Sequence, residues 1–317
     1  MSQRPRVLRV LVLGLAVLGV ALGSVLPASA AGVQIRSWPI PTPDSEPVEI
    51  TLGPDGNLWF TEQNGSAVAR VTPRGVITEF TLPTFGFPND ITAGPDGNVW
   101  FSEGSNGRIA RILPDGRIRE FVFDEFGSAL GITTGPDGNI WFTASPGQVW
   151  RFALDSKTFT SFDTPTPNSF PSDITTGSDG NLWFVEGVGK IARITPDGVI
   201  TEFDEPLELP FAITTGPDGK VWFTERFNQR IGKVTPAGDF TFYTTELHTL
   251  DSIVSGPGGL LWFTSFGDDR VANITTDGLI TPMPEVPNSG PTGISPDSRG
   301  RIWFLGHSSN RVYRLKL

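Results

Sequence analysis

A Trp-Phe pair recurs seven times along the chain at nearly constant spacing. The pairs begin at Trp59, Trp100, Trp141, Trp183, Trp222, Trp262 and Trp303, at intervals of 39 to 42 residues. Repeats of about 40 to 50 residues, each built from several short strands, are typical of β-propeller blades. Seven such units fill most of the 317-residue chain, so this repeat restricts the fold more than any other feature.

Each unit is predicted to contain four short strands. In the first unit these are residues 48–52, 57–62, 67–71 and 76–82, and the turn sequences Gly-Pro-Asp-Gly and Thr-Pro-Arg-Gly follow the first and third. Pro and Gly recur where a helical solenoid would need its helices, and no 3.6-residue periodicity is sustained. The sequence therefore predicts an all-β fold, a seven-bladed β-propeller with four-stranded antiparallel blades.

The seventh unit ends one strand short of a blade. Its strands are expected around Ile294, at residues 301–304 and at residues 312–317. Residues 33–40, VQIRSWPI, are similar in pattern to the fourth strand of the first unit, VITEFTL. We expect this N-terminal strand to pair into the last blade and close the ring, which would leave no open sheet edge.

The first thirty residues have the features of a signal peptide. Arginines at positions 4, 6 and 9 precede an apolar run at residues 10–22, and Ala28-Ser29-Ala30 matches a signal-peptidase site. A retained membrane anchor is the alternative, but the apolar run is short for a span of about 20 residues. We expect residues 1–30 to be removed and residues 31–317 to form the propeller of a secreted, extracellular protein without a membrane span.

Charge and cysteine content narrow the range of partners and chemistries. Without the three leader arginines, 21 Lys and Arg face 34 Asp and Glu, a net charge of −13. This argues against nucleic acid or an anionic membrane surface as partner. The chain has no cysteine, which excludes disulfides, thiolate metal sites and Cys nucleophiles. Nine Trp and 23 Phe can instead supply a large core, and we expect a monomer.

The Gly-Pro-Asp-Gly turn, which precedes most of the Trp-Phe pairs with small variations, has two interpretations. Pro, Asp and Gly at these positions have ordinary turn chemistry. A calcium loop is the alternative, but each copy carries one acid and calcium needs six or more oxygen ligands. We therefore predict a structural role for Asp55 and its equivalents, and we expect the aromatic pairs to fill the wedges between blades.

The residue three positions after each Trp varies from unit to unit. The series is Glu62, Glu103, Ala144, Glu186, Glu225, Ser265 and Gly306. We expect it on the face that carries the loops between blades, opposite the tight turns. Because this scaffold repeats on one face and varies on the other, the variable face is the predicted binding face.

The loops of that face combine aromatic and acidic residues. The aromatic residues are Phe85, Phe87, Phe126, Phe170, Phe227 and Phe266, and Asp90, Asp173 and Asp251 are expected near the central opening. One interpretation is a site for an amphipathic small-molecule or peptide ligand, with or without a divalent cation. The other is a solvated acidic mouth whose aromatic residues brace the loops.

Several repeated segments resemble those of one known family. ITAGPDGNVWFSE at residues 91–103, IARITPDG at 191–198 and VITEF at 76–80 are similar to segments of the virginiamycin B lyase family, also called streptogramin lyases. The resemblance covers essentially the whole chain after the leader. It implies a seven-bladed propeller and, in active members, a magnesium-dependent elimination that opens the ester of a cyclic depsipeptide antibiotic.

The resemblance also implies catalytic residues that this sequence lacks. Active members carry a His two residues before the first-strand Ile in each of the last two blades, the last within Glu-Pro-His-Gly. A second Glu follows the final Trp-Phe pair, and the carboxylates serve the metal. Here Asp251 and Thr292 occupy the two His positions, Gly290 occupies the Glu position, and Leu305-Gly306-His307 follows the pair. Thr292 cannot act as the base that removes a proton acidified by a cation-polarised carbonyl.

Three hypotheses follow. The first is a noncatalytic propeller that binds an amphipathic ligand on its variable face through Thr292, Phe211 and Phe227. The second is a lyase that opens a cyclic depsipeptide ester, with His307 or His248 as base and Asp251, Glu225 and Glu186 as ligands of the magnesium ion that the resemblance implies. The third is an interaction scaffold that uses the outer rim. The missing Glu-Pro-His-Gly segment favours the noncatalytic hypotheses.

Overall fold

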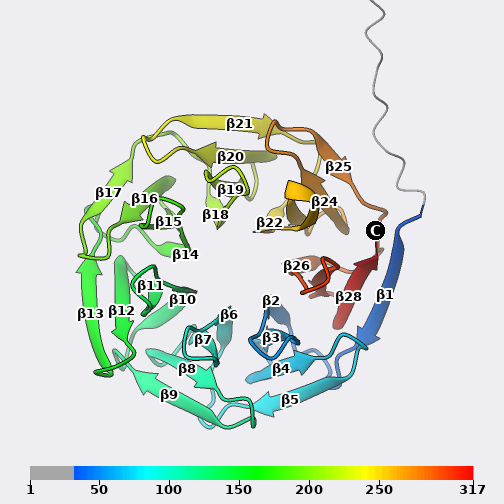
Figure 1. Ribbon diagram of the computed structural model, residues 1–317, viewed down its shortest axis with the longest axis horizontal. Helices are drawn as coiled ribbons and strands as arrows, with labels where there is room; N and C mark the ends of the chain where they lie inside the picture. The colour runs from blue at the N-terminus through cyan, green and yellow to red at the C-terminus, as the bar shows by residue number, and fades with distance from the viewer. Residues whose placement is uncertain (1–31, 317) are drawn as a thin grey trace, which may run out of the picture.

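The computed structural model describes residues 32–316, so the predicted signal peptide lies outside the described residues. Seven four-stranded sheets surround a central axis (Figure 1). A short 3-10 turn, η1 (Pro257–Gly259), is the one helical element among the described residues. The predicted all-β, seven-bladed propeller is confirmed. Within residues 32–316, no helix has the length and apolar character to span a membrane.

Blades 1 to 6 each consist of four strands that follow one another in sequence. Blade 1 contains β2 (Pro47–Leu52), β3 (Leu58–Glu62), β4 (Ala67–Val71) and β5 (Ile77–Thr81), and blade 2 contains β6 (Pro88–Ala93), β7 (Val99–Glu103), β8 (Arg108–Ile112) and β9 (Ile118–Val122). Blade 3 contains β10 (Ser128–Thr134), β11 (Ile140–Ser145), β12 (Gln148–Ala153) and β13 (Thr158–Asp163), and blade 4 contains β14 (Pro171–Thr176), β15 (Leu182–Glu186), β16 (Lys190–Ile194) and β17 (Ile200–Phe203). Blade 5 contains β18 (Pro210–Thr215), β19 (Val221–Glu225), β20 (Arg230–Val234) and β21 (Phe240–Thr244), and blade 6 contains β22 (Leu250–Ser255), β23 (Leu261–Ser265), β24 (Arg270–Ile274) and β25 (Ile280–Pro282).

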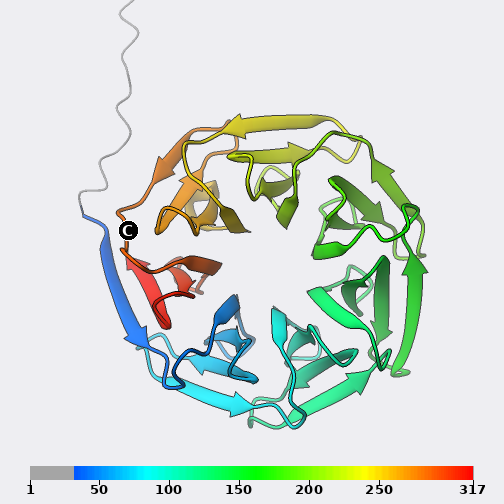
Figure 2. The ribbon, with the colours of Figure 1, turned by 180° about the vertical axis from the view of Figure 1, so that it is seen from behind.

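Blade 7 joins the two ends of the described chain. Its strands are β26 (Pro291–Pro296), β27 (Ile302–Gly306), β28 (Arg311–Lys316) and, on the outside, β1 (Gln34–Pro39). Strand β1 pairs antiparallel with β28, and Figure 2 shows β1 in blue on the rim beside the red strands. Trp38 of β1 stacks on Trp303 with ring centroids 5.2 Å apart. The predicted closure of the ring is confirmed.

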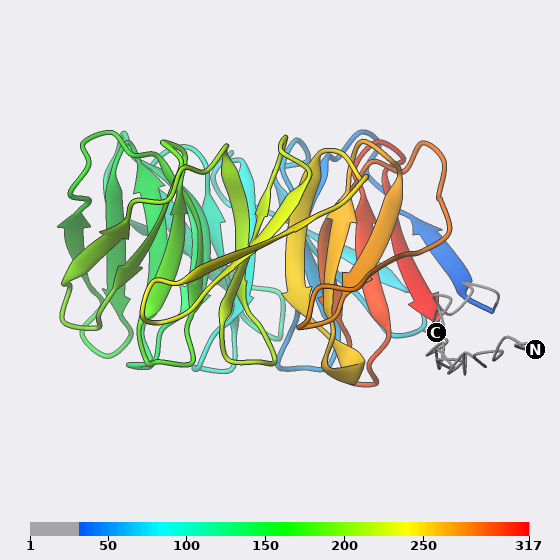
Figure 3. The same ribbon diagram turned by 90° about the horizontal axis from the view of Figure 1, so that it is seen from above.

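The strand pairing defines two faces of the disc. Pro47 at the start of β2 lies opposite Glu62 at the end of β3, so the loops between blades emerge at one end of each sheet. We call this end the loop face. The tight turns lie at the opposite end, the turn face, from which η1 projects at the lower edge of Figure 3.

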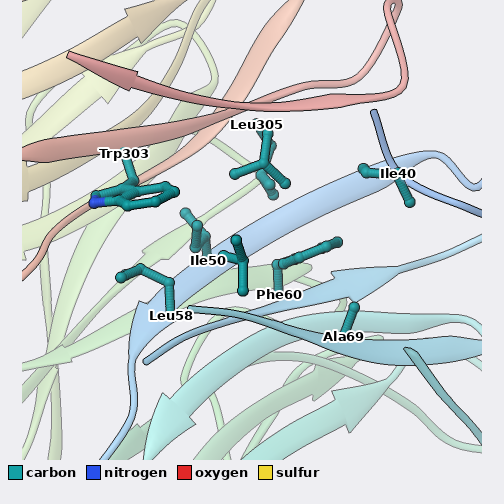
Figure 4. Packing of buried hydrophobic residues seen from close by; sticks show 9 residues of the cluster. Ile40, Ile50, Leu58, Phe60, Ala69, Trp303 and Leu305 are labelled. Atoms are coloured by element: carbon teal, nitrogen blue, oxygen red, sulfur yellow. The ribbon is translucent and has the colours of Figure 1, made fainter. Parts of the chain in front are cut away.

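The Trp-Phe pairs fill the wedges between blades, as predicted. Successive residues of a strand point to opposite sides of the sheet. Trp59 therefore packs with Ile91 of blade 2, whereas Phe60 packs with Ile50 of its own blade and Trp303 of blade 7 (Figure 4). All seven tryptophans of the repeat are at most 2% exposed.

In six of the seven blades, the Asp of the turn before the Trp accepts a hydrogen bond from the indole N–H, and blade 6 has Gly258 at that position. The Oδ1 atom of Asp55 accepts hydrogen bonds from the backbone N–H of Asn57 and from the indole N–H of Trp59, at 3.1 and 3.0 Å. Arg70 lies over the Trp59 ring, 5.4 Å from its centroid, and 3.8 Å from Asp55. We call this set the Asp–Trp–Arg unit. The fold thus engages the Asp55 carboxylate, as the structural interpretation of the turn predicted.

Candidate functional site

A cavity of about 450 Å³ lies on the axis of the ring, and we call it the mouth cavity. It is lined by the first strands of the blades. The residues two positions before the first-strand Ile contribute from blades 1 to 6: Val48, Asn89, Leu130, Ser172, Phe211 and Asp251. Since these positions lie near the start of the first strand, the lining extends to the loop face.

Four carboxyl groups line the mouth cavity: Glu49, Asp90, Asp173 and Asp251. Asp90 accepts hydrogen bonds from the backbone N–H of Ile91 in its own blade and of Ile132 in the next, at 2.6 and 2.7 Å. Asp173 makes the same pair of bonds between blades 4 and 5. Two of the four therefore also join neighbouring blades at the axis.

Burial raises the pKa of all four carboxyl groups. The pKa of Asp173 rises to about 7 and that of Asp251 to about 6. Burial raises the pKa of Glu49 well above its usual range, and the charges of Asp90, Asp173 and Asp251 add to this shift. The mouth cavity therefore carries fewer negative charges at neutral pH than the sequence suggests. Glu49 was missed at the sequence level, although it occupies the same repeat position as Asp90 and Asp173.

Asp251 belongs to a small cluster that the sequence did not reveal. Its Oδ2 atom lies 3.2 Å from a guanidinium nitrogen of Arg226. The Arg226 guanidinium carbon lies 4.0 Å from the ring centroid of Phe211, a cation–π distance. Asp251 is 5% exposed, and both Arg226 and His307 oppose the rise of its pKa by their charge. Phe211 and Asp251 are thus brought together with a cation between them.

His307 and Thr292 meet at one backbone carbonyl. The Thr292 hydroxyl donates to the Pro47 oxygen at 3.1 Å, and the His307 Nδ1 atom lies 3.3 Å from the same oxygen. The Phe266 ring lies beside His307, with centroids 6.1 Å apart. When the His307 Nδ1–H donates to Pro47, the Nε2 atom is the one left to accept a proton.

His248 and Phe227 lie away from this cluster. The His248 side chain is 59% exposed and its Nδ1 lies 3.2 Å from Asp268 Oδ1. Phe227 is 66% exposed. Neither lines the mouth cavity. Of the predicted residues, Phe211 and Asp251 line it, while Thr292 and His307 lie beside it and share the Pro47 carbonyl.

The glutamates predicted as metal ligands lie beneath the loops. Glu186 and Glu225 are fully buried, and Glu225 is held by Arg230 at 2.6 Å and by Asn228 at 2.9 Å. Within residues 32–316, no group of three or more His, Cys, Asp or Glu could hold a metal ion. Asp251, Glu225 and Glu186 are therefore not gathered into one such group.

The physical reason is the alternation of side chains at the end of the second strand. Glu225 pairs with Pro210 at the base of the loop that enters blade 5, so its side chain is covered. The next residue, Arg226, points to the other side and reaches Asp251. The same position, four residues after the Trp, supplies Phe266 and His307 in blades 6 and 7. At the ends of the second strands, the residues on the mouth side therefore lie one position after the variable series that begins with Glu62.

Comparisons with known proteins identify the family. The sequence model of the virginiamycin B lyase family matches residues 23–249 and 204–317 of this chain. The chain belongs to this family, as the resemblance indicated.

Solved structures extend the similarity over the whole propeller. A streptogramin B lyase structure has a TM-score of 0.86 and 29% identity, covering 92% of this chain and 99% of its own. Virginiamycin B lyase from Staphylococcus aureus has a TM-score of 0.84 and 32% identity, covering 90% and 99%. A catalytically inactive His-to-Ala variant of that enzyme with quinupristin gives the same values.

The curated relatives match over a shorter segment. Virginiamycin B lyase of Saccharopolyspora erythraea is 44% identical over 50 residues, 16% of this chain and 17% of the relative. That of Bordetella pertussis is 35% identical over 51 residues, with the same coverage. These matches span about a sixth of the relatives' length.

Proposed function

We propose that this protein is a secreted member of its family that binds an amphipathic, peptide-like ligand in the mouth cavity without opening it by elimination. The observation that carries the proposal is the cluster of Phe211, Arg226 and Asp251 at the wall of the cavity. It offers an aromatic face and both charges within a cavity of about 450 Å³, a size suited to a small ligand. A solved relative that contains quinupristin supports a ligand of this kind.

The residues at the positions of the family's acid and base do not support an elimination. Thr292 has no basic group, and its hydroxyl is used on the Pro47 carbonyl. Gly290 has a φ of 52°, and a Cβ there would overlap the hydroxyl of Ser308. A Glu at position 290 would therefore be strained by this φ and would need the Ser308 side chain to move. Neither residue can take the role that the resemblance assigns to its position.

A second candidate function is an elimination with His307 as general base. It rests on the hydrogen bond to Pro47, which orients the ring and leaves Nε2 to accept a proton. The neighbouring Asp251 would stabilise the protonated ring. In this scheme the base comes from the end of β27 instead of from the start of β26.

The test uses residues 31–317 with quinupristin. Binding is measured by calorimetry, and product by chromatography with fragment mass spectrometry, because an elimination leaves the mass unchanged. Both measurements are made once with magnesium and once with a metal chelator. Saturable binding without a linear product supports the first function. A product that disappears in His307→Ala supports the second, and the absence of both binding and product refutes both for this ligand.

Matched variants locate the binding site. Phe211→Ala is expected to weaken binding about tenfold, the effect of losing one buried aromatic contact. Phe126→Ala is the control, because Phe126 is 95% exposed on another loop of the same face. Equal losses in the two variants would contradict binding in the mouth cavity.

A further inference from the structure

A second cleft lies on the turn face, at the junction of blades 7 and 1. It has a volume of about 890 Å³, and five of its nine lining residues are arginines: Arg36, Arg74, Arg299, Arg301 and Arg314. Lys316 lines an adjoining hollow with four of these arginines. The described residues that line either space include no acid, although the whole chain has a net charge of −10.

In the first five blades, the Asp–Trp–Arg unit balances one base against one acid. The pairs are Arg70 with Asp55, Arg111 with Asp96, Arg151 with Asp137, Arg193 with Asp179 and Lys233 with Asp218. Each base also lies over the Trp of its blade. The unit is therefore close to neutral in these blades.

Blade 7 departs from this balance. Its acid, Asp297, accepts hydrogen bonds from Arg301 Nε at 2.6 Å and from the Trp303 indole at 2.9 Å. Two bases lie over the Trp303 ring: Arg301 at 6.0 Å and Arg314 at 5.2 Å, and Arg314 is also 5.2 Å from the centroid of Trp38. Arg314 donates to the carbonyl oxygen of Pro73 at 2.8 Å. At this position one carboxylate therefore faces two guanidinium groups, which leaves a net positive charge.

A third arginine adds to the surplus. Arg36 of β1 stands directly opposite Arg314 of β28, and like charges in this arrangement repel. Arg314 is 8% exposed and its Nε atom has no hydrogen-bond partner among the described residues. Burial lowers the pKa of Arg314, and the charges of Arg301 and Arg36 add to the effect. A buried guanidinium beside like charges is stabilised by a counter-charge.

We propose that this cleft binds a tetrahedral oxyanion of the phosphate or sulfate type. Arg301 and Arg314 form its inner wall, and the rim carries the exposed residues Arg36, Arg74 and Arg299. Guanidinium groups present paired N–H donors that match the oxygens of such an anion. The cleft is on the face opposite the mouth cavity, so the oxyanion site does not depend on the proposed function. The anion is either free or carried as a group on a larger molecule.

The test is a calorimetric titration of residues 31–317 with inorganic pyrophosphate, with sodium chloride holding the ionic strength constant. We expect saturable binding of one anion per chain. Arg36→Gln combined with Arg299→Gln is expected to weaken it at least tenfold, since each charged hydrogen bond contributes roughly a factor of ten. Both residues are exposed, so the double variant should fold.

The matched control is Arg117→Gln combined with Arg119→Gln. It removes the same charge from an exposed turn and an exposed fourth strand of blade 2, and it should change the affinity less than twofold. An equal loss in both double variants would mean general electrostatic attraction and would overturn the proposal.

A second arm distinguishes the two sources of the anion. Vesicles containing phosphatidic acid are tested by co-sedimentation beside free pyrophosphate. Pyrophosphate binding that the vesicles compete for supports a site that also accepts a carried phosphate, and pyrophosphate binding without vesicle binding supports a site for the free anion. Vesicle binding with no saturable response to pyrophosphate would overturn a discrete oxyanion site.

Discussion

The buried Glu62 should make the stability of this propeller fall as pH rises. Glu62 is fully buried, and neither of its carboxyl oxygens has a hydrogen-bond partner among the described residues. Burial raises its pKa from 4.5 to about 8, and the charge of Glu79 adds to the shift. Glu79 is itself held by the backbone N–H and hydroxyl of Thr42. The perturbation that isolates this effect is Glu62→Gln, which keeps the shape and cannot ionise.

The sign and size follow from proton linkage. Between pH 4.5 and about 8 the unfolded chain has lost the Glu62 proton and the folded chain retains it. Each pH unit in this window lowers the free energy of unfolding by about 1.4 kcal/mol. The full window therefore corresponds to roughly 5 kcal/mol. The Glu62→Gln variant lacks this pH-dependent loss of unfolding free energy. Its stability relative to the natural chain should therefore rise steadily with pH.

The assay is guanidinium unfolding at pH 5, 6, 7 and 8, followed by the fluorescence of the buried tryptophans. We expect the difference in unfolding free energy between Glu62→Gln and the natural chain to grow by several kcal/mol across the series. Glu125→Gln changes an exposed Glu and should give a constant difference. A constant difference for Glu62→Gln as well would refute the assignment of a raised pKa to Glu62.

Three further predictions concern packing and charge, each measured by thermal or guanidinium unfolding. Trp38→Ala removes the ring that stacks on Trp303 and should cost about 3 kcal/mol; an unchanged midpoint would contradict closure by β1. Arg230→Ala leaves Glu225 buried without its cation and should cost about 3–5 kcal/mol, and adding Glu225→Gln should recover part of it. Gly75 and Gly56 both have positive φ, but a Cβ would overlap Trp38 only at Gly75. Gly56→Ala should therefore cost about 1–2 kcal/mol and Gly75→Ala clearly more, so equal losses would contradict the packing.

The blade architecture was predictable from the sequence because its signals are local. The strands expected at residues 48–52, 57–62, 67–71 and 76–82 are found within one residue of those limits. Turn residues and strand alternation act over a few positions, and seven copies of one pattern reinforce the same assignment. The pairing of β1 with β28 was also predictable, since the last unit is otherwise incomplete.

The mouth was harder to predict because it is built by contacts between blades. Whether Glu225 or Arg226 faces the mouth depends on the register at the end of β19 and on the loop that covers it. Glu49 could have been found from its repeat position beside Asp90 and Asp173. The contact of Arg226 with Phe211 and Asp251 joins residues from two blades, and no short segment encodes it.

The closure by β1 also sets the order of events when this chain is made. Strand β1 is synthesised before every other described strand, and its partner β28 is the last. At a synthesis rate of roughly 5–20 residues per second, β1 waits on the order of tens of seconds for that partner. During this time Ile35 lacks the residues of blades 6 and 7 on which it packs, and Trp38 lacks Trp303. Protection of this one short segment, more than the folding of any single blade, is therefore the step on which the yield of closed rings should depend.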